Sequence, residues 1–216
     1  MPRLRSPMLR PAPKRRPLPN DYRPDRGQVL LDGRDITGRR PQEIVGLGVA
    51  RSFQVMSLFD EFTVFENVAV ALPATRARGG DLLGQAYADP TLVAETHDVL
   101  DKVGLEPQAN QPAKSLSYGQ RRALEIGVAL ACRPKLLFLD EPTAGLGSDG
   151  RARLADLVRS LKGNVTLVII EHDMQFLFSL AEEISVIHWG QVIARGTPDA
   201  LRDNGWVRRS ALGSVA

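Results

Sequence analysis

Cysteine is nearly absent from this sequence of 216 residues, and no hydrophobic run is long enough to span a bilayer. The one cysteine, Cys132, excludes an internal disulfide framework and a metal site built from several cysteines, which favours a reducing cytoplasm as the compartment. Hydrophobic runs such as Leu136–Leu139 and Val165–Ile170 are far shorter than the roughly 18 residues of a membrane-spanning helix. We therefore predict that any role at a membrane is exerted through a partner.

Acidic residues are scarce at the N-terminus. Residues 1–24 contain seven arginines and lysines but only one acid, Asp21, so they carry +6 and leave 3 − 6 = −3 for residues 25–216. They also hold seven of the fifteen prolines, which lack an N–H and disfavour helix in the preceding residue. We expect an extended, unstructured arm without the features of a targeting signal. The mildly acidic remainder argues against a broad nucleic-acid interface, so no nucleic acid is expected as a partner.

From about residue 25 the sequence takes on the pattern of an α/β domain. Strands made of continuous Leu, Val, Ile and Phe are typical of a mostly parallel sheet buried under helices on both faces, which binds ligands at the carboxyl ends of its strands. Residues 28–33 are expected to form a short strand that runs into a turn, and the other expected strands are 49–53, 135–139, 165–170, 184–188 and 191–194. The expected helices are 41–47, 63–72, 91–103, 118–131, 148–161 and 174–181, and residues 74–90 are expected to form a surface excursion.

Two carboxylates follow one of the most hydrophobic strands. Leu136–Leu139 precede Asp140 and Glu141, which places both acids where a ligand of the sheet would lie. One carboxylate can hold a Mg²⁺ ion and the next can orient or deprotonate a water molecule, the division of labour that phosphoryl transfer requires. The alternative is a strand that ends in two solvated acids.

Two further short motifs carry polar groups suited to phosphate. His172 follows the strand 165–170, where it can donate a hydrogen bond to a phosphate or hold a loop; the alternative is a plain surface histidine. Leu116–Gln120, LSYGQ, opens a helix. Ser117 offers a hydroxyl, Gly119 permits close backbone approach, and the free N–H groups of the helix start favour an anion. The alternative there is an ordinary serine cap followed by a glycine.

Together these motifs resemble those of the ATP-binding subunits of ABC transporters. LSYGQ, LLFLDEPTAGL and VIIEHDM follow one another in the order and at the spacing of that family's signature motif, Walker B motif with D-loop, and H-loop. Upstream, VARSFQ at 49–54 resembles the Q-loop, and residues 59–67 resemble the segment that faces the membrane subunit's coupling helix. The resemblance runs from about Tyr22 to Gly213. The phrases YRPDRGQVLLDGRDITG, IIEHDM and WGQVIARGTPDALRDN are most similar to subunits that power uptake of branched-chain amino acids and related polar solutes.

The resemblance implies a P-loop NTPase-like fold that uses ATP and Mg²⁺. Residues 25–216 would form the ATP-binding domain, with a helical subdomain at about 60–133. By motif position, Glu141 and His172 would be catalytic, Asp140 and Gln54 would contact the metal and nucleotide of the chain's own site, and Leu116, Ser117, Gly119 and Gln120 would contact the nucleotide held by a second subunit. The implied partners are that second ATP-binding subunit, in a homodimer or heterodimer, the membrane permease subunits and, indirectly, a solute-binding protein. Such a subunit would lie in the cytoplasm, peripheral on the inner face of the cell membrane.

The family's Walker A loop, GxxxxGK[S/T], is missing from this sequence. None of its five lysines, at 14, 102, 114, 135 and 162, follows a glycine. In the family, that loop with its strand and helix precedes the segment matched by Tyr22–Gly33, so we expect an N-terminally incomplete fold. Gly147 also stands where the D-loop usually carries Asp or Asn. Three explanations of the arm stay open: a frame error or wrong start, a truncated and degenerate subunit, or a true basic arm that binds an anionic surface.

Two functions are compatible with these motifs. The first is an ATP-binding subunit that couples ATP hydrolysis to uptake of amino acids of the branched-chain type or a similar solute. The second is a degenerate, non-hydrolysing subunit that lends LSYGQ to an intact partner. We expect the isolated chain to hydrolyse ATP negligibly, because no phosphate loop positions the β- and γ-phosphates. We also expect unpaired edges on the strands that end at Asp140 and Ile170, and with them marginal stability.

Overall fold

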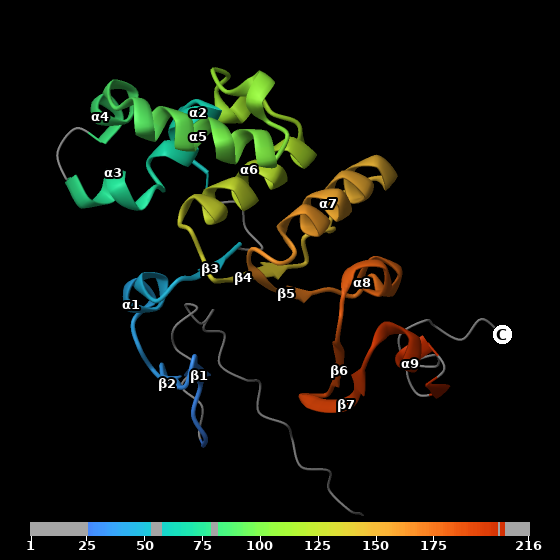
Figure 1. Cartoon of the computed structure of the whole chain (residues 1–216). Coiled ribbons are helices and arrows are strands. Elements are labelled where there is room, and N and C mark those ends of the chain that lie inside the picture. The colour runs from blue at the N-terminus through green and yellow to red at the C-terminus, as the bar shows by residue number, and fades with distance from the viewer. Residues whose placement is uncertain (1–25, 53–57, 79–81, 203, 206–216) are drawn as a thin grey trace, which may run out of the picture. The chain divides into compact units, whose positions relative to one another are not determined.

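The computed structural model describes residues 26–52, 58–78, 82–202 and 204–205. It divides the chain into two compact units, one up to Gly46 and one from Leu47 onward (Figure 1). The predicted arm, residues 1–24, and the predicted metal and nucleotide ligand Gln54 lie outside the described residues. In the part of the chain that is described, every helix is too short or too polar to cross a membrane.

The described part of the first unit is a short hairpin followed by a helix. Strands β1 (Leu30–Leu31) and β2 (Arg34–Asp35) pair antiparallel, and α1 spans Pro41–Gly46. Asp32 and Gly33 between the strands have φ of 50° and 76°, the left-handed pair of a two-residue hairpin turn. The short strand running into a turn that was predicted at 28–33 is confirmed, whereas the return strand β2 was not predicted.

The second unit contains a parallel sheet. Its strands are β3 (Val49–Arg51), β4 (Leu136–Asp140) and β5 (Thr166–Ile170), in the order β3-β4-β5. The prediction of unpaired edges was wrong for β4, because β3 and β5 pair with it on either side. It holds for β5, which pairs along one edge only within the described residues. The prediction from the hydrophobic runs that these strands pair in parallel is confirmed.

The described segment between β3 and β4 is mainly helical. Its helices are α2 (Val64–Ala69), α3 (Pro73–Arg78), α4 (Leu82–Ala88), α5 (Pro90–Lys102) and α6 (Tyr118–Ala131), with short 3₁₀ turns at Glu106–Gln108 and Ala113–Ser115. Their apolar residues share one core, and Leu72, Leu92, Leu100 and Leu124 in it are fully buried. The surface excursion predicted at 74–90 contains two helices that the sequence did not predict, α3 and α4. A tertiary contact supports α4: the Tyr87 ring stacks on Phe65, with centroids 5.0 Å apart.

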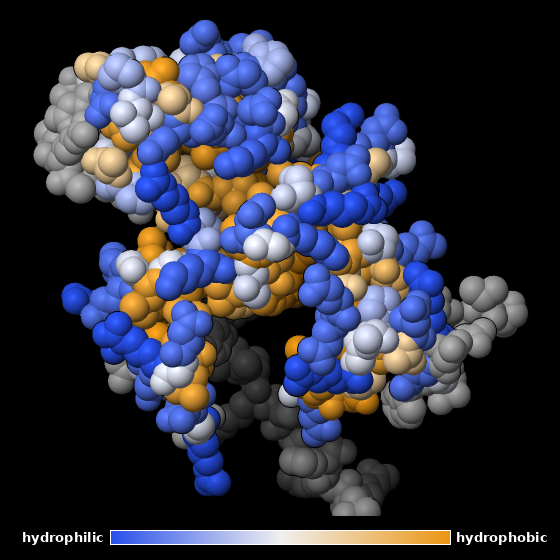
Figure 2. Space-filling model, in the orientation of Figure 1, coloured by the Kyte–Doolittle hydropathy of each residue, from blue (hydrophilic) through white to orange (hydrophobic). Residues whose placement is uncertain are grey.

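One face of the sheet is covered by helices. Leu137 and Leu139 of β4 are fully buried against α6, α7 (Ser148–Leu161) and α8 (Met174–Leu180). On the opposite face, Val168 and Ile170 of β5 are 37% and 52% exposed, and Figure 2 shows hydrophobic residues gathered over the sheet. The prediction that this strand is buried on both faces was wrong, because no described element of this unit covers its second face.

The described chain ends in a second hairpin and a short helix. Strands β6 (Ile184–His188) and β7 (Gln191–Gly196) pair antiparallel, and α9 spans Pro198–Arg202. Met174 and Leu177 of α8 pack with Ile184 and Leu201 in a third small core, which attaches the hairpin to α8. The order of strands and helices after residue 118 follows the one that the sequence predicted.

Candidate functional site

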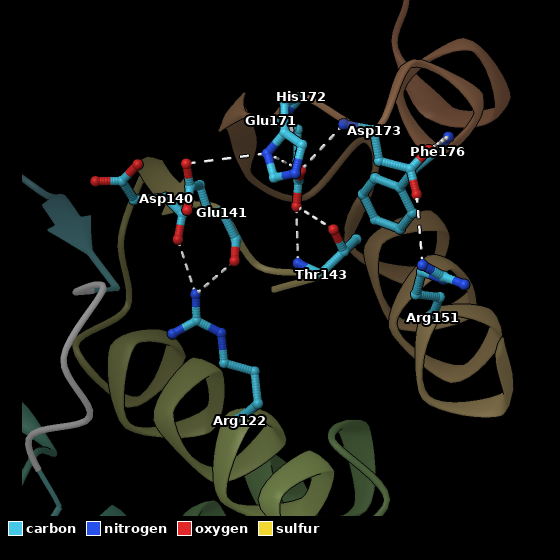
Figure 3. Close-up of polar contacts among 9 residues, drawn as sticks. All are labelled: Arg122, Asp140, Glu141, Thr143, Arg151, Glu171, His172, Asp173 and Phe176. Carbon is cyan, nitrogen blue, oxygen red and sulfur yellow. Dashed lines mark hydrogen bonds and ion pairs between the residues drawn. The ribbon is translucent and has the colours of Figure 1, made fainter. Parts of the chain in front are cut away.

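Two parallel strands end side by side at the candidate site (Figure 3). Asp140 at the end of β4 is the register partner of Ile170 at the end of β5. Glu141 follows the first strand and His172 follows the second, so the two motifs meet at one edge of the sheet. The sequence predicted this meeting, because carboxyl ends of parallel strands lie at the same edge.

Glu141 has a strained backbone that its neighbours hold in place. Its φ of 45° lies in the left-handed region, which costs a non-glycine residue on the order of 1–3 kcal/mol. Its N–H donates to the Ile170 carbonyl at 2.8 Å, and its own carbonyl accepts from Arg122 Nη2 at 3.2 Å. The same Arg122 nitrogen donates to the Asp140 carbonyl at 2.8 Å. These bonds fix the turn from which the Glu141 carboxylate projects.

The Glu141 and His172 side chains face each other. Oε1 of Glu141 lies 3.9 Å from Nδ1 of His172, close but beyond hydrogen-bond distance. The His172 side chain is 78% exposed, whereas Glu141 is 38% exposed. A carboxylate and an imidazole are thus placed together at the surface of the protein.

Asp140 is engaged by a cation of the chain itself. Arg51 Nη2 of β3 donates to Asp140 Oδ2 at 2.7 Å, and the Asp140 side chain is 20% exposed. Mg²⁺ is usually held by one or two carboxylates together with substrate phosphates, so Asp140 fits as a single protein ligand for Mg-ATP. Among the described residues no group of three or more acidic, histidine or cysteine side chains is arranged to hold a metal.

The start of α6 is a second, separate group of predicted site residues. Ser117 is the N-cap: its hydroxyl accepts from the Gln120 N–H at 3.4 Å, and Gln120 Oε1 accepts from the Ser117 N–H at 2.9 Å. Leu116 is buried in the helical core. Gly119 leaves room beside Leu146, since an added Cβ would lie 3.7 Å from Leu146 Cδ2. The predicted helix start is confirmed, and the cap leaves the remaining N–H groups of the first turn available to a ligand.

A cleft opens beside this helix start. It has a volume of about 680 Å³ and is lined by the end of α5, the first turns of α6, and α7. A smaller hollow of about 280 Å³ lies between Ser117–Gly119 and Gly145–Gly150. Asp140, Glu141 and His172 line neither. The structure thus brings the predicted residues together in two groups, one at the strand ends and one at the start of α6, and their roles stay predictions.

Three residues near the strand ends were not predicted from the sequence. Arg122 pairs with Glu125 inside the protein, Nη1 to Oε2 at 2.5 Å, and reaches the two carbonyls of the strained turn. Thr143 and Glu171 join the loops that follow β4 and β5. The spacing of Arg122 and Glu125, three apart on a helix, is a signal for the first of them. Thr143 and Glu171 lie within the motifs LLFLDEPTAGL and VIIEHDM, although no role was assigned to them there.

Comparisons with known proteins indicate the same family as these motifs. The family model described as ABC transporter matches residues 16–144. BraF of Pseudomonas aeruginosa, a high-affinity branched-chain amino acid transport ATP-binding protein, is 37% identical over 203 residues, covering 90% of this chain and 79% of BraF. LivG of Escherichia coli K12, which has the same description, is 35% identical with the same shares covered.

A solved structure agrees at the level of the fold. The ADP conformation of MJ1267, an ATP-binding cassette of an ABC transporter, matches with a TM-score of 0.72 and 28% identity, covering 88% of this chain and 78% of that one. The predicted α/β fold is confirmed by this match. With the motifs in order along the chain and a family model over more than half of it, the chain belongs to the ABC transporter family as an ATP-binding subunit.

Proposed function

We propose that this chain couples ATP hydrolysis to the uptake of a branched-chain amino acid or a similar solute. The observation that carries the proposal is the pairing of Glu141 and His172, 3.9 Å apart at the ends of adjacent strands. The similarity to BraF and LivG, whose descriptions name branched-chain amino acid transport, supports the class of solute.

Each residue at the strand ends has a distinct task in this proposal. Mg²⁺ bound with ATP neutralises the charge that develops on the phosphates. Asp140 would hold the metal through its carboxylate, which Arg51 also contacts. Glu141 orients and deprotonates the attacking water molecule, and His172 donates a hydrogen bond to the γ-phosphate. The strained turn places the Glu141 carboxylate before the substrate arrives, so positioning costs little at the moment of reaction.

The site is completed by partners in this proposal. Leu116, Ser117, Gly119 and Gln120 contact the nucleotide of a second ATP-binding subunit, in a homodimer or heterodimer. Permease subunits in the cell membrane bind the pair on its cytoplasmic face, and a solute-binding protein delivers the solute to them. The separation of the predicted residues into two groups supports this arrangement, because one group would act on each nucleotide of the dimer.

A second candidate function is favoured by one specific observation. The sequence has no glycine-lysine pair for a phosphate loop, whereas the start of α6 has an intact capping box around Ser117. A subunit that does not hydrolyse ATP could still present this helix start to the nucleotide of an intact partner. In that case Ser117 would matter for transport and Glu141 would not.

Uptake of radiolabelled leucine by proteoliposomes that contain the assembled transporter separates the two functions. If this chain hydrolyses ATP, Glu141→Gln lowers hydrolysis and uptake by about a hundredfold or more, the usual contribution of a general base. Glu182→Gln, at an exposed carboxylate that is 3.9 Å from Lys162, is the matched control and leaves both unchanged. Full activity of Glu141→Gln together with loss of activity in Ser117→Ala would overturn the first function in favour of the second.

A further inference from the structure

The Glu171 carboxylate is buried at the centre of a small hydrogen-bond network. Its side chain is fully buried, although the adjacent His172 side chain is 78% exposed. Oε1 accepts from both the N–H and the hydroxyl of Thr143, at 2.8 and 2.5 Å. Oε2 accepts from the N–H groups of His172 at 3.0 Å and Asp173 at 3.4 Å. A buried carboxylate is tolerated because its hydrogen bonds offset the cost of removing it from water.

This network joins two loops that are 28 residues apart in the sequence. Thr143 belongs to the loop after β4, two residues beyond Glu141, and Glu171 directly precedes His172. Pairing between the strands ends at Asp140 and Ile170. Beyond that point the Glu141 N–H still donates to the Ile170 carbonyl. The Glu171 network then joins the two loops through Thr143 (Figure 3).

The turn that carries Glu141 is therefore held by opposite charges on its two sides. On one side the Arg122 guanidinium, from α6, binds the carbonyls of Asp140 and Glu141. On the other side the Glu171 carboxylate binds the N–H and hydroxyl of Thr143. A strained backbone persists only when its surroundings hold it, and here two buried charged side chains do so.

We propose that Glu171 is a positioning residue that sets the separation of Glu141 and His172 through the Thr143 hydroxyl. The inference rests on the proposed catalytic roles of Glu141 and His172. Glu171 itself acts from within the protein, because its side chain has no exposed surface. Loosening its bond to Thr143 lets the two loops move independently, so the base and the hydrogen-bond donor lose their fixed distance while the surfaces that bind nucleotide are unchanged.

The substitutions Thr143→Val and Thr143→Ser separate a hydrogen-bond role from a packing role. Valine keeps the shape of threonine and removes the hydroxyl, whereas serine keeps the hydroxyl and removes the methyl group. The readout is the imidazole NMR spectrum of the full nucleotide-free chain, which has only three histidines. We expect Thr143→Val to shift the His172 resonances and Thr143→Ser to leave them near the wild-type positions, with His97 and His188 unmoved in both. The reverse pattern would overturn the proposal.

Amide hydrogen exchange gives a second measurement on the same chain. Glu171→Gln removes the acceptor-only character of the side chain, so we expect exchange at the amides of Thr143 and His172 to rise by about tenfold or more. Glu182→Gln changes charge equally on an exposed carboxylate and leaves both amides unchanged. Unchanged exchange in Glu171→Gln overturns the proposal. If Glu171→Gln does not fold, the NMR comparison of Thr143→Val with Thr143→Ser tests the proposal by itself.

Hydrolysis by the assembled transporter separates failure of this inference from failure of the proposed function. With wild-type hydrolysis present, Thr143→Val is expected to lower kcat by about tenfold to a hundredfold at unchanged KM for ATP, and Thr143→Ser to restore it. Hydrolysis that is insensitive to both Thr143→Val and Glu171→Gln overturns the positioning role. Absence of hydrolysis in the wild type, with the expected NMR shift present, overturns the proposed function and leaves the link between the loops established.

Discussion

Arg122 and Glu125 show how much a single residue's surroundings decide its importance. Their side chains are only 5% and 8% exposed, and Arg122 also binds two backbone carbonyls of the strained turn. Asp156 and Arg159 have the same spacing on α7, but their side chains are 76% and 50% exposed. When one member of a buried ion pair is removed, the other charge stays inside the protein, which solvates it poorly. When one member of an exposed ion pair is removed, water solvates the remaining charge.

These two pairs supply a prediction and its control. We expect Glu125→Ala to lower the free energy of unfolding by about 3 kcal/mol or more, because Arg122 loses its carboxylate while it stays buried. Asp156→Ala is expected to cost less than about 0.5 kcal/mol. Urea unfolding followed by circular dichroism measures both. Equal losses for the two variants would show that the buried pair contributes no more than the exposed one.

Caps define the helix starts, and α7 is the exception among the longer helices. Thr63 and Ser117 cap α2 and α6 with complete capping boxes, and Asp89 and Asp173 cap α5 and α8. At the start of α7, Gly147 has an extended backbone and no side chain to accept a bond. Nothing lies within 4 Å of a Cβ added there, so a longer residue fits.

Gly147→Asp is therefore expected to stabilise the protein. An aspartate at this N-cap accepts from a free N–H of the first turn and faces the positive end of the helix dipole, for a gain of about 0.3–1 kcal/mol. Gly147→Ala is the control and is expected to destabilise slightly, because alanine is a poor cap. Thermal unfolding of the two variants measures the difference. A lower melting temperature for the aspartate variant than for the alanine variant would contradict the capping argument.

The hairpin of β6 and β7 carries a pH-dependent ion pair. Arg195 donates to both Glu183 oxygens, Nε to Oε1 at 2.5 Å and Nη2 to Oε2 at 2.9 Å, and these bonds hold the pKa of Glu183 below its usual range. The unfolded chain thus binds a proton at this group more readily than the folded one. Stability from the pair is complete above the ordinary glutamate pKa of about 4.3 and is lost as the pH falls further.

Acid titration of a matched variant tests this contribution. We expect Glu183→Gln to be less stable than the wild type at pH 6 and to lose less stability between pH 6 and pH 3, because glutamine does not titrate. The control Glu182→Gln, next to it in the sequence, keeps the wild-type slope over the same interval. Chemical denaturation at a series of pH values measures the slopes. Parallel curves for Glu183→Gln and the wild type would exclude the pair as a source of acid sensitivity.

At the scale of the whole molecule, one face of the parallel sheet is only partly covered by the described residues. Its buried face packs against three helices, but Val168 and Ile170 project from the other face of β5, and β5 pairs along one edge only within those residues. Exposed apolar strands with an open edge favour association between copies. We therefore expect the 216-residue chain to self-associate at micromolar concentration and to unfold below about 50 °C, the low end of the mesophile range.

Val168→Lys tests the source of that association. The substitution replaces an exposed apolar side chain by a charged one, and we expect sedimentation velocity to show a larger monomer fraction at the same concentration. Thr166→Lys adds the same charge to the same face of β5 without removing apolar surface, so its effect is expected to be smaller. Equal effects of the two substitutions would assign the association to net charge instead of the hydrophobic face.

Much of the fold could be predicted because its signals are local. The hydrophobic runs of β4 and β5, the serine before α6 and the acids after β4 are each readable within a few residues, and pattern alone placed Asp140, Glu141 and His172 at one edge of the sheet. The helices α3 and α4 could not be predicted in this way. Their segment is rich in arginine and glycine, and a contact such as the stacking of Tyr87 on Phe65 exists only after folding.

The sequence by itself determined the family, the parallel sheet and the order of the phosphate-handling motifs, since each depends on short stretches with fixed spacing. Only the tertiary structure decided that Glu171 is buried while His172 is exposed, that Arg122 reaches the carbonyls of a strained turn, and that Arg51 engages Asp140. The contacts of Arg122 and Arg51 join residues 18 to 89 positions apart. Burial and hydrogen bonding between distant segments are set by how the elements pack, and no local pattern of residue types specifies that packing.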